Sequence, residues 1–195
     1  MLHSSFQKKI KILNLFKIEQ IYLLETILKL FPIRKSKLLF LNFTSIFSNS
    51  YPEENKIALG IAPFSQHKGK MYPLEKIEEI IHYFYHKDIP IYIFGSEKEA
   101  EKIKEWQERY PKIRPVMGLP LVEVLQIIQK MKVILSMDSA NLHFASLVTT
   151  PAVSVWEATH PYLGFYGWGQ AKENIVRKNI SCSPCSTFGN MTIRY

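Results

Sequence analysis

Residues 56–94 read KIALGIAPFSQHKGKMYPLEKIEEIIHYFYHKDIPIYIF. This stretch opens with a short, continuous apolar run at 57–62, which is typical of a strand that is buried on both faces. Pro73 then begins a helical pattern that lasts to Lys87, because apolar residues recur on one helix face. A second apolar run follows at 89–94. Strand, helix and strand in this order predict two parallel strands joined by a helical crossover.

The same alternation continues along the rest of the chain. We expect helices at 97–110, 121–130 and 141–147, and strands at 113–117, 133–135 and 152–156. These strands are continuously apolar, which indicates an α/β fold with a parallel sheet and helices on both faces. Right-handed crossovers then give a Rossmann-like domain, in which ligands bind beyond the carboxyl ends of the strands.

The composition narrows the class of protein. Of 195 residues, 47% are hydrophobic and 22% are charged, which is typical of a globular protein and not of a disordered one. No apolar run approaches the roughly 18 residues of a membrane span, and lysines interrupt any signal-peptide pattern near the N-terminus. We therefore expect a cytoplasmic protein. Its net charge of +8 favours peripheral contact with an anionic membrane surface, whereas no motif supports binding to nucleic acid.

The first quarter of the chain differs in character from the remainder. Apolar residues recur at roughly helical spacing up to Phe31, and Pro32 ends that pattern. A short strand fits residues 37–43, and residues 48–55 have the composition of a linker. We expect residues 1–55 to form a mostly helical segment with a linker, and residues 56–195 to form the Rossmann-like domain.

Polar and basic side chains follow the first predicted strand. Ser65, Gln66 and Lys70 lie in a loop that leads into a helix. Hydroxyl, amide and ammonium groups near a helix N-terminus suit an anion, and Lys70 would reach a diphosphate as a point charge. The alternative is that Lys70 is an ordinary solvated lysine.

Acidic residues follow the second predicted strand, at Glu97 and Glu99. Carboxylates in a first helical turn are stabilising by themselves, which is one interpretation of this pair. The other interpretation is that one of them hydrogen-bonds a ribose diol, as acidic residues do in other nucleotide-binding α/β folds.

The segment after the fourth predicted strand combines polar side chains with a helix start. Asp138 or Ser139 would cap the following helix in a purely structural interpretation. In a functional one, Asp138 faces the hydroxyl groups of a ligand, and the first free backbone N–H groups, at Ala140 and Asn141, face it too. His143 lies one turn further on, either packed against protein or in contact with that ligand.

Two cysteines, Cys182 and Cys185, lie in a loop rich in serine and proline. One pair cannot supply the four ligands of a structural zinc site, so we expect no metal. We expect an accessible loop with reduced thiols, or else one half of a larger cysteine cluster.

Together these segments resemble glycosyltransferase family 9, the ADP-heptose:lipopolysaccharide heptosyltransferases. The resemblance extends over about residues 57–185 and rests on three motifs. A small-Pro pair is followed by Lys-x-aromatic-Pro (62–63 and 70–73), and Gly-Ser is followed by an acid (95–96 and Glu99). The third motif is Asp-Ser/Thr-Gly-x-x-His followed by an alanine (138–145), and the pattern continues with the strand at 151–156 and the cysteine pair at 182–185. Two positions depart from the family pattern: Ala140 replaces a glycine, and residues 157–161 replace a glycine-rich turn.

The resemblance implies the C-terminal, donor-binding half of a GT-B fold, in which two Rossmann-like domains face each other. It implies phosphate contacts from Lys70 and Ser65 beside the N–H groups of Ser139 and Ala140, and a role for Asp138 in orienting the sugar or the phosphate. Glu99 would hold the ribose, and Leu119 would lie beside the adenine. The implied substrate-binding residues are Ser65, Gln66, Lys70, Glu99, Leu119, Asp138, Ser139, Ala140 and His143.

The resemblance also implies a reaction without metal or cofactor. A hexosyl or heptosyl group would pass from an ADP-sugar to the lipopolysaccharide core or to a lipid A-type acceptor, with a carboxylate of the N-terminal domain as base. Residues 1–55 are too short for that domain, so we expect a donor-binding fragment, also truncated at its C-terminus, that is inactive alone. The alternatives are a non-catalytic or degenerate sugar-nucleotide-binding module and a sugar-nucleotide epimerase of the same architecture.

Overall fold

The computed structural model describes residues 57–177 and 183–190, together with positions 23, 25–27 and 29. The described positions between 23 and 29 are helical, as the sequence predicts. The predicted strand at 37–43 and the predicted linker at 48–55 lie outside the described residues.

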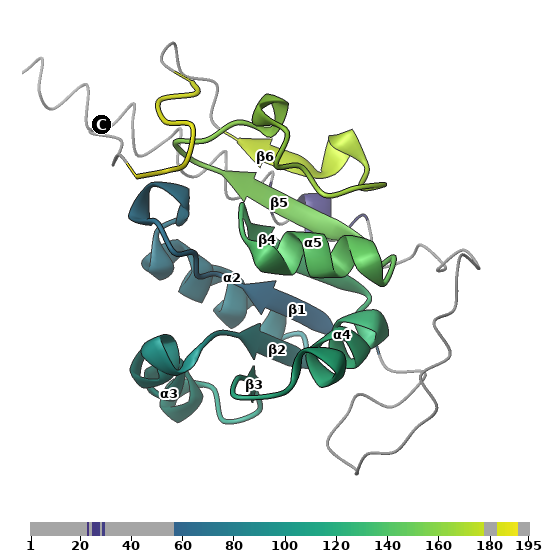
Figure 1. Cartoon of the computed structure of the whole chain (residues 1–195). Helices are drawn as coiled ribbons and strands as arrows, with labels where there is room; N and C mark the ends of the chain where they lie inside the picture. The colour runs from purple at the N-terminus through teal and green to yellow at the C-terminus, as the bar shows by residue number, and fades with distance from the viewer. Residues whose placement is uncertain (1–22, 24, 28, 30–56, 178–182, 191–195) are drawn as a thin grey trace, which may run out of the picture.

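The described strands form one six-stranded sheet, in the order β3-β2-β1-β4-β5-β6 (Figure 1). Every neighbouring pair is parallel. The sheet therefore grows in one direction from β1 to β3 and in the other from β4 to β6, which is the doubly wound Rossmann arrangement that the sequence predicts. The strands are β1 (Leu59–Ala62), β2 (Ile91–Phe94), β3 (Arg114–Val116), β4 (Val133–Met137), β5 (Ala152–Trp156) and β6 (Ile175–Arg177).

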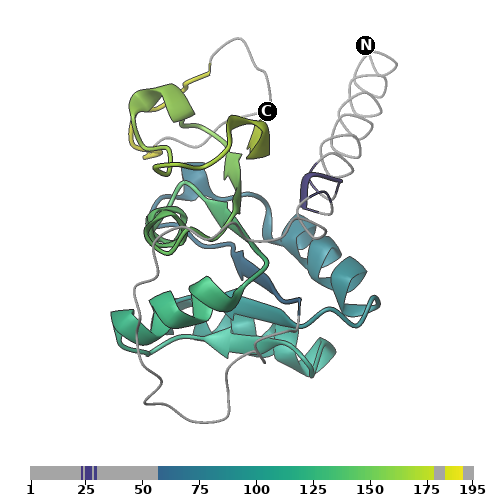
Figure 2. The same cartoon turned by 90° about the vertical axis from the view of Figure 1, so that its right-hand side faces the viewer.

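Helices cover both faces of this sheet (Figures 1 and 2). The α-helices are α2 (Leu74–Tyr85), α3 (Ala100–Arg109), α4 (Leu121–Lys130) and α5 (Ala140–Leu147). Ile77 of α2 and Trp106 of α3 belong to one core cluster, whereas Ile128 of α4 and Leu142 of α5 belong to the other. Short 3-10 turns add η1 (Lys68–Lys70), η2 (Glu97–Glu99), η3 (Pro161–Leu163) and η4 (Lys172–Asn174).

The central strand β1 shows why the strands are continuously apolar. Leu59 and Ile61 pack into the core cluster under α2 and α3, whereas Ala62 packs into the cluster under α4 and α5. Gly60 lies between them, and a Cβ there would come within 3.1 Å of both Ile134 and Phe94. Because both faces are covered, neither face of the strand tolerates a polar side chain.

The N-terminal helical residues pack against this domain. Leu23 and Ile27 are buried in the same core cluster as α2 and α3, and Figure 2 shows their helix beside α2. The boundary near residue 55 and the division of the chain at that point stay predictions.

Four strands differ from their predicted extents: β1, β2 and β3 are shorter than the predicted strands at 57–62, 89–94 and 113–117, and β4 is longer. β4 continues through Ser136 and Met137, because the buried Ser136 hydroxyl donates to the Met137 carbonyl oxygen at 2.9 Å and so is satisfied inside the sheet. β6 was not predicted, since a three-residue edge strand carries too little apolar pattern. Within the described residues, no helix combines the length and apolarity needed to cross a membrane.

Candidate functional site

The carboxyl ends of β1 to β4 open into one cavity of about 800 Å³. Such a cavity is expected in a doubly wound sheet, where loops diverge at the point at which the strand order reverses. All nine residues predicted as substrate-binding line it: Ser65, Gln66, Lys70, Glu99, Leu119, Asp138, Ser139, Ala140 and His143.

An ion pair lies where the strand order reverses. Lys70 follows β1, Asp138 follows the adjacent β4, and the Lys70 Nζ lies 2.8 Å from Asp138 Oδ2. The side chains are only 13% and 4% exposed. The Thr159 hydroxyl, just beyond β5, donates to the same Oδ2 at 2.9 Å. Asp138 thus joins the ends of three strands, and Lys70 is not an ordinary solvated lysine.

Helix α5 presents its N-terminus to the same cavity. Ser139 is the N-cap residue, but its side chain makes no capping hydrogen bond, and the Asp138 carboxylate is engaged by Lys70 and Thr159 instead. Neither side chain therefore caps the helix, and the purely structural interpretation of this turn is wrong. Since the first turn of a helix leaves backbone N–H groups without intrahelical partners, the positive end of α5 is available to an anion.

His143 lies one turn further along α5. Its side chain is exposed and lines the cavity, which excludes the alternative that it is packed against protein.

Glu99 takes part in a capping box. Its Oε2 accepts hydrogen bonds from the Ser96 backbone N–H at 2.8 Å and from the Ser96 hydroxyl, and the Ser96 side chain accepts in turn from the Lys98 N–H. The structural interpretation of this acid is thus correct. Both bonds to Glu99 use Oε2, and the side chain also lines the cavity.

A sequence profile of glycosyltransferase family 9 (heptosyltransferase) matches residues 34–193, which is most of the chain. The chain belongs to this family.

Solved structures of family 9 proteins share the fold. The E. coli heptosyltransferase WaaC with ADP is 22% identical, with a TM-score of 0.58, over 67% of this chain and 40% of that one. E. coli ADP-heptose lps heptosyltransferase II is 18% identical (TM-score 0.55; 68% and 41% covered), and the family 9 protein from Veillonella parvula DSM 2008 is 19% identical (0.56; 65% and 36%). The match thus spans less than half of each structure. No curated protein matches the chain significantly.

The cavity of this chain has an aromatic wall that the sequence analysis missed. Phe165 and Phe188 line it, with ring centroids 6.1 Å apart, and the Lys70 Nζ lies 5.2 Å from the Phe165 centroid. Phe188 belongs to the segment at 183–190. This segment contacts the loops that follow β1 and β5, which are distant from it in sequence. No local sequence pattern predicts these contacts.

Thr159 was also missed, although a signal for it exists. It lies just beyond the carboxyl end of β5, at the same sheet edge as Lys70 and Asp138. The rule that located those two residues applies to it equally.

Backbone contacts hold the segment at 183–190 against the cavity. The N–H groups of Cys185 and Ser186 both donate to the Ala158 carbonyl oxygen, and the Gly69 N–H donates to the Gly189 carbonyl oxygen at 3.2 Å. Gly189 has a φ of 74°, and a Cβ there would collide with the Lys70 side chain. Glycine at this position therefore makes room for the lysine.

Cys185 is half-buried and disulfide-bonded, so the expectation of a reduced thiol is wrong for this residue. Its neighbour in the motif, Cys182, lies outside the described residues. Within the described part of the chain, no group of three or more His, Cys, Asp or Glu side chains is suited to a metal ion.

Two titratable side chains beyond β5, His160 and Tyr166, form hydrogen bonds that stabilise the loops there. Burial, and to a smaller extent Arg177, lowers the pKa of His160, whose Nδ1 accepts from the Tyr162 N–H at 3.0 Å. Burial and then Glu173 raise the pKa of Tyr166 to about 12, and its hydroxyl donates to the Ala171 carbonyl oxygen at 2.6 Å. His160 is therefore biased to its neutral form, and Tyr166 remains protonated at neutral pH.

A second cavity, of about 400 Å³, lies at the opposite edge of the sheet. Tyr85, Asp88 and Arg114 are among the residues that line it, near the amino ends of β2 and β3. The larger cavity is the better candidate because it has the carboxyl ends of the strands, a helix N-terminus and a partly buried lysine.

Proposed function

We propose that this family 9 chain binds a sugar nucleotide, with the diphosphate at the junction of β1 and β4. One observation carries the proposal: Lys70, Asp138 and the N-terminus of α5 meet in a single cavity where the strand order reverses. A partly buried lysine and a helix N-terminus together provide the positive potential that a diphosphate requires.

The remaining cavity residues suit a nucleoside. Glu99 follows β2 and Leu119 follows β3, so both lie on one side of the proposed diphosphate site. A carboxylate suits a ribose diol, and an exposed apolar side chain suits the face of a base. The similar WaaC structures were solved with ADP and with ADP-2-deoxy-2-fluoro heptose, which supports an ADP-sugar as the donor.

The proposed chemistry is glycosyl transfer with the nucleoside diphosphate as leaving group. Lys70 and the α5 amides would stabilise the negative charge that grows on the diphosphate as the sugar departs, and no metal is required. The acceptor would be a lipopolysaccharide core or lipid A-type sugar, reached at the cytoplasmic face of a membrane that attracts the basic chain.

We assign no general base to this chain. The matched region corresponds to 40% of the WaaC chain, so we propose that the acceptor hydroxyl is activated by a carboxylate outside that region. Binding without transfer is the alternative. Ala140 supports it, because a Cβ stands where the family has glycine beside the phosphate.

Calorimetric titration with ADP in the presence of EDTA tests the proposal. Lys70→Ala should weaken ADP binding by about 1–3 kcal/mol, since it removes a charge-assisted hydrogen bond. Lys68→Ala is the matched control, because Lys68 is an exposed lysine on the same 3-10 turn, and it should leave the dissociation constant unchanged. Circular dichroism would verify that both variants are folded. Equal affinity of wild type and Lys70→Ala would remove Lys70 from the site.

A further inference from the structure

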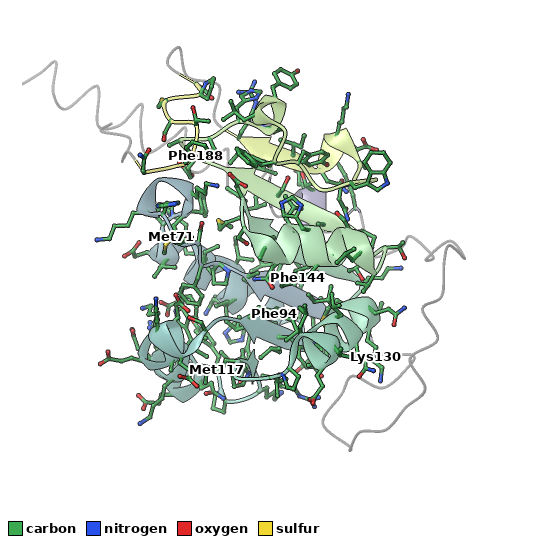
Figure 3. The ribbon with its side chains drawn as sticks, viewed as in Figure 1. Met71, Phe94, Met117, Lys130, Phe144 and Phe188 are labelled. Atoms are coloured by element: carbon green, nitrogen blue, oxygen red, sulfur yellow. The ribbon has the colours of Figure 1, made fainter. Side chains whose placement is uncertain are left out.

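The aromatic pair Phe165–Phe188 stands at one end of the candidate site. In Figure 3 the labelled side chains run from Phe188 at the top, past Phe144 and Phe94, to Met117 at the bottom. All of these residues line the cavity. The pair thus lies at the opposite end from Met117, which follows β3.

The residues that line the cavity follow one another in the order of the strands that precede them. Leu119 and Glu99 follow β3 and β2, Lys70 and Asp138 follow β1 and β4, and Phe165 comes after β5. A sugar nucleotide also has its parts in a fixed order, namely base, ribose, diphosphate and sugar. If the diphosphate lies at Lys70 and the nucleoside on the β2 side, the sugar falls beside the aromatic pair.

The pair is built like a preformed binding surface. Phe188 is 59% exposed, yet the Ser186 hydroxyl accepts from the Gly189 N–H at 2.9 Å and donates to Asn190 Oδ1 at 2.8 Å. These bonds hold the turn that carries the ring. A ring that is exposed but held in place loses little conformational freedom when a ligand packs against it.

The aromatic pair lies next to the charged group at the proposed diphosphate site. The Lys70 Nζ lies over the Phe165 ring and pairs with Asp138, so the face of the ring and the proposed phosphate site are adjacent. Aromatic faces pack against the C–H-bearing face of a pyranose ring, while hydroxyl groups at its edge reach polar side chains.

We propose that Phe165 and Phe188 hold the sugar ring of the donor. This inference rests on the proposed function and adds to it a subsite for a pyranose, distinct from the diphosphate and nucleoside contacts. We call Phe165 and Phe188 the aromatic platform. Because only a sugar nucleotide carries a sugar ring, the platform should raise the affinity for a sugar nucleotide above that for the bare nucleoside diphosphate.

The test compares ADP with ADP-heptose as ligands of the full chain by calorimetry. Phe188→Ala should weaken ADP-heptose binding about three- to tenfold and leave ADP binding unchanged. Phe188→Tyr keeps the ring and should behave as wild type. Trp168→Ala is the matched control, because Trp168 is 90% exposed and is not among the residues that line the cavity.

The outcomes separate this inference from the function on which it rests. If Phe188→Ala weakens both ligands equally, or neither, the platform is overturned while the diphosphate site stands. If wild type binds neither ligand, the proposed function is overturned and the platform with it. Selective loss of ADP-heptose affinity in Phe188→Ala, with Phe188→Tyr and Trp168→Ala unaffected, supports the platform.

Discussion

The two halves of the cavity are built in different ways. On the β1–β4–β5 side, Lys70, Asp138 and Thr159 are 13%, 4% and 1% exposed, and their contacts join residues far apart in sequence. On the β2–β3 side, Glu99 bonds only three residues away, to Ser96, in a local helix cap. The first half is thus held by contacts between residues that are distant in sequence, whereas the second half is held by a local helix cap.

This difference has a physical consequence for mutations. A change in the buried half should lower both the stability of the domain and its affinity for a diphosphate. A change in the local half should separate the two effects, because a helix cap and a ligand contact depend on different properties of the side chain.

The largest effect is expected for Asp138→Ala. It leaves Lys70 as a buried charge without its partner, which should lower the free energy of unfolding by about 3 kcal/mol. That value is the lower end of the range for breaking a buried pair, because Lys70 keeps some access to water. Urea unfolding followed by circular dichroism measures it.

Glu79→Ala is the matched control for that experiment. Glu79 pairs with Lys76 at 2.7 Å on the surface of α2, and exposed pairs contribute little to stability. If Asp138→Ala were as stable as Glu79→Ala, the buried half of the site would not depend on its ion pair.

A smaller effect is expected for Thr159→Val. The change keeps the shape of the buried side chain but removes the hydroxyl that donates to Asp138 Oδ2, which should cost about 1–2 kcal/mol of unfolding free energy. Thr159→Ser keeps the hydroxyl and should recover part of that loss. Identical urea midpoints for the valine variant and wild type would show that this hydrogen bond contributes nothing.

The smallest effect on stability, and the clearest separation, is expected at Glu99 and Ser96. Glutamine also completes a capping box, so Glu99→Gln should keep stability but weaken ADP binding about three- to tenfold through loss of the carboxylate. Ser96→Ala should do the reverse and cost about 0.5–1 kcal/mol of stability without weakening ADP binding. If ADP affinity instead followed helix stability in both variants, Glu99 would be a capping residue only.

The fold was predictable because the four central strands, β1, β2, β4 and β5, are buried on both faces. Continuous apolar runs such as 57–62 and 152–156 separate clearly from one-sided helical patterns such as 73–87. β6 was missed, since residues 175–177 carry only part of such a run. The edge strand β3 includes Pro115, which is tolerated at an edge but weakens the strand pattern.

The site was predictable to the extent that a strand end defines it. The carboxyl-edge rule places Lys70 and Asp138 together, and the structure shows them in contact. The same rule does not reveal Phe188, because its position depends on how residues 183–190 return to the loop before α2. Nor could the sequence show that Asp138 bonds Lys70 and Thr159 and leaves the helix uncapped, since that choice is made by tertiary contacts.

A crystal structure of the chain with ADP tests the central claim most directly. Our account predicts diphosphate oxygens within hydrogen-bonding distance of the Lys70 Nζ and of the first backbone N–H groups of α5. A diphosphate in the smaller cavity near Arg114, at the amino ends of β2 and β3, would contradict it.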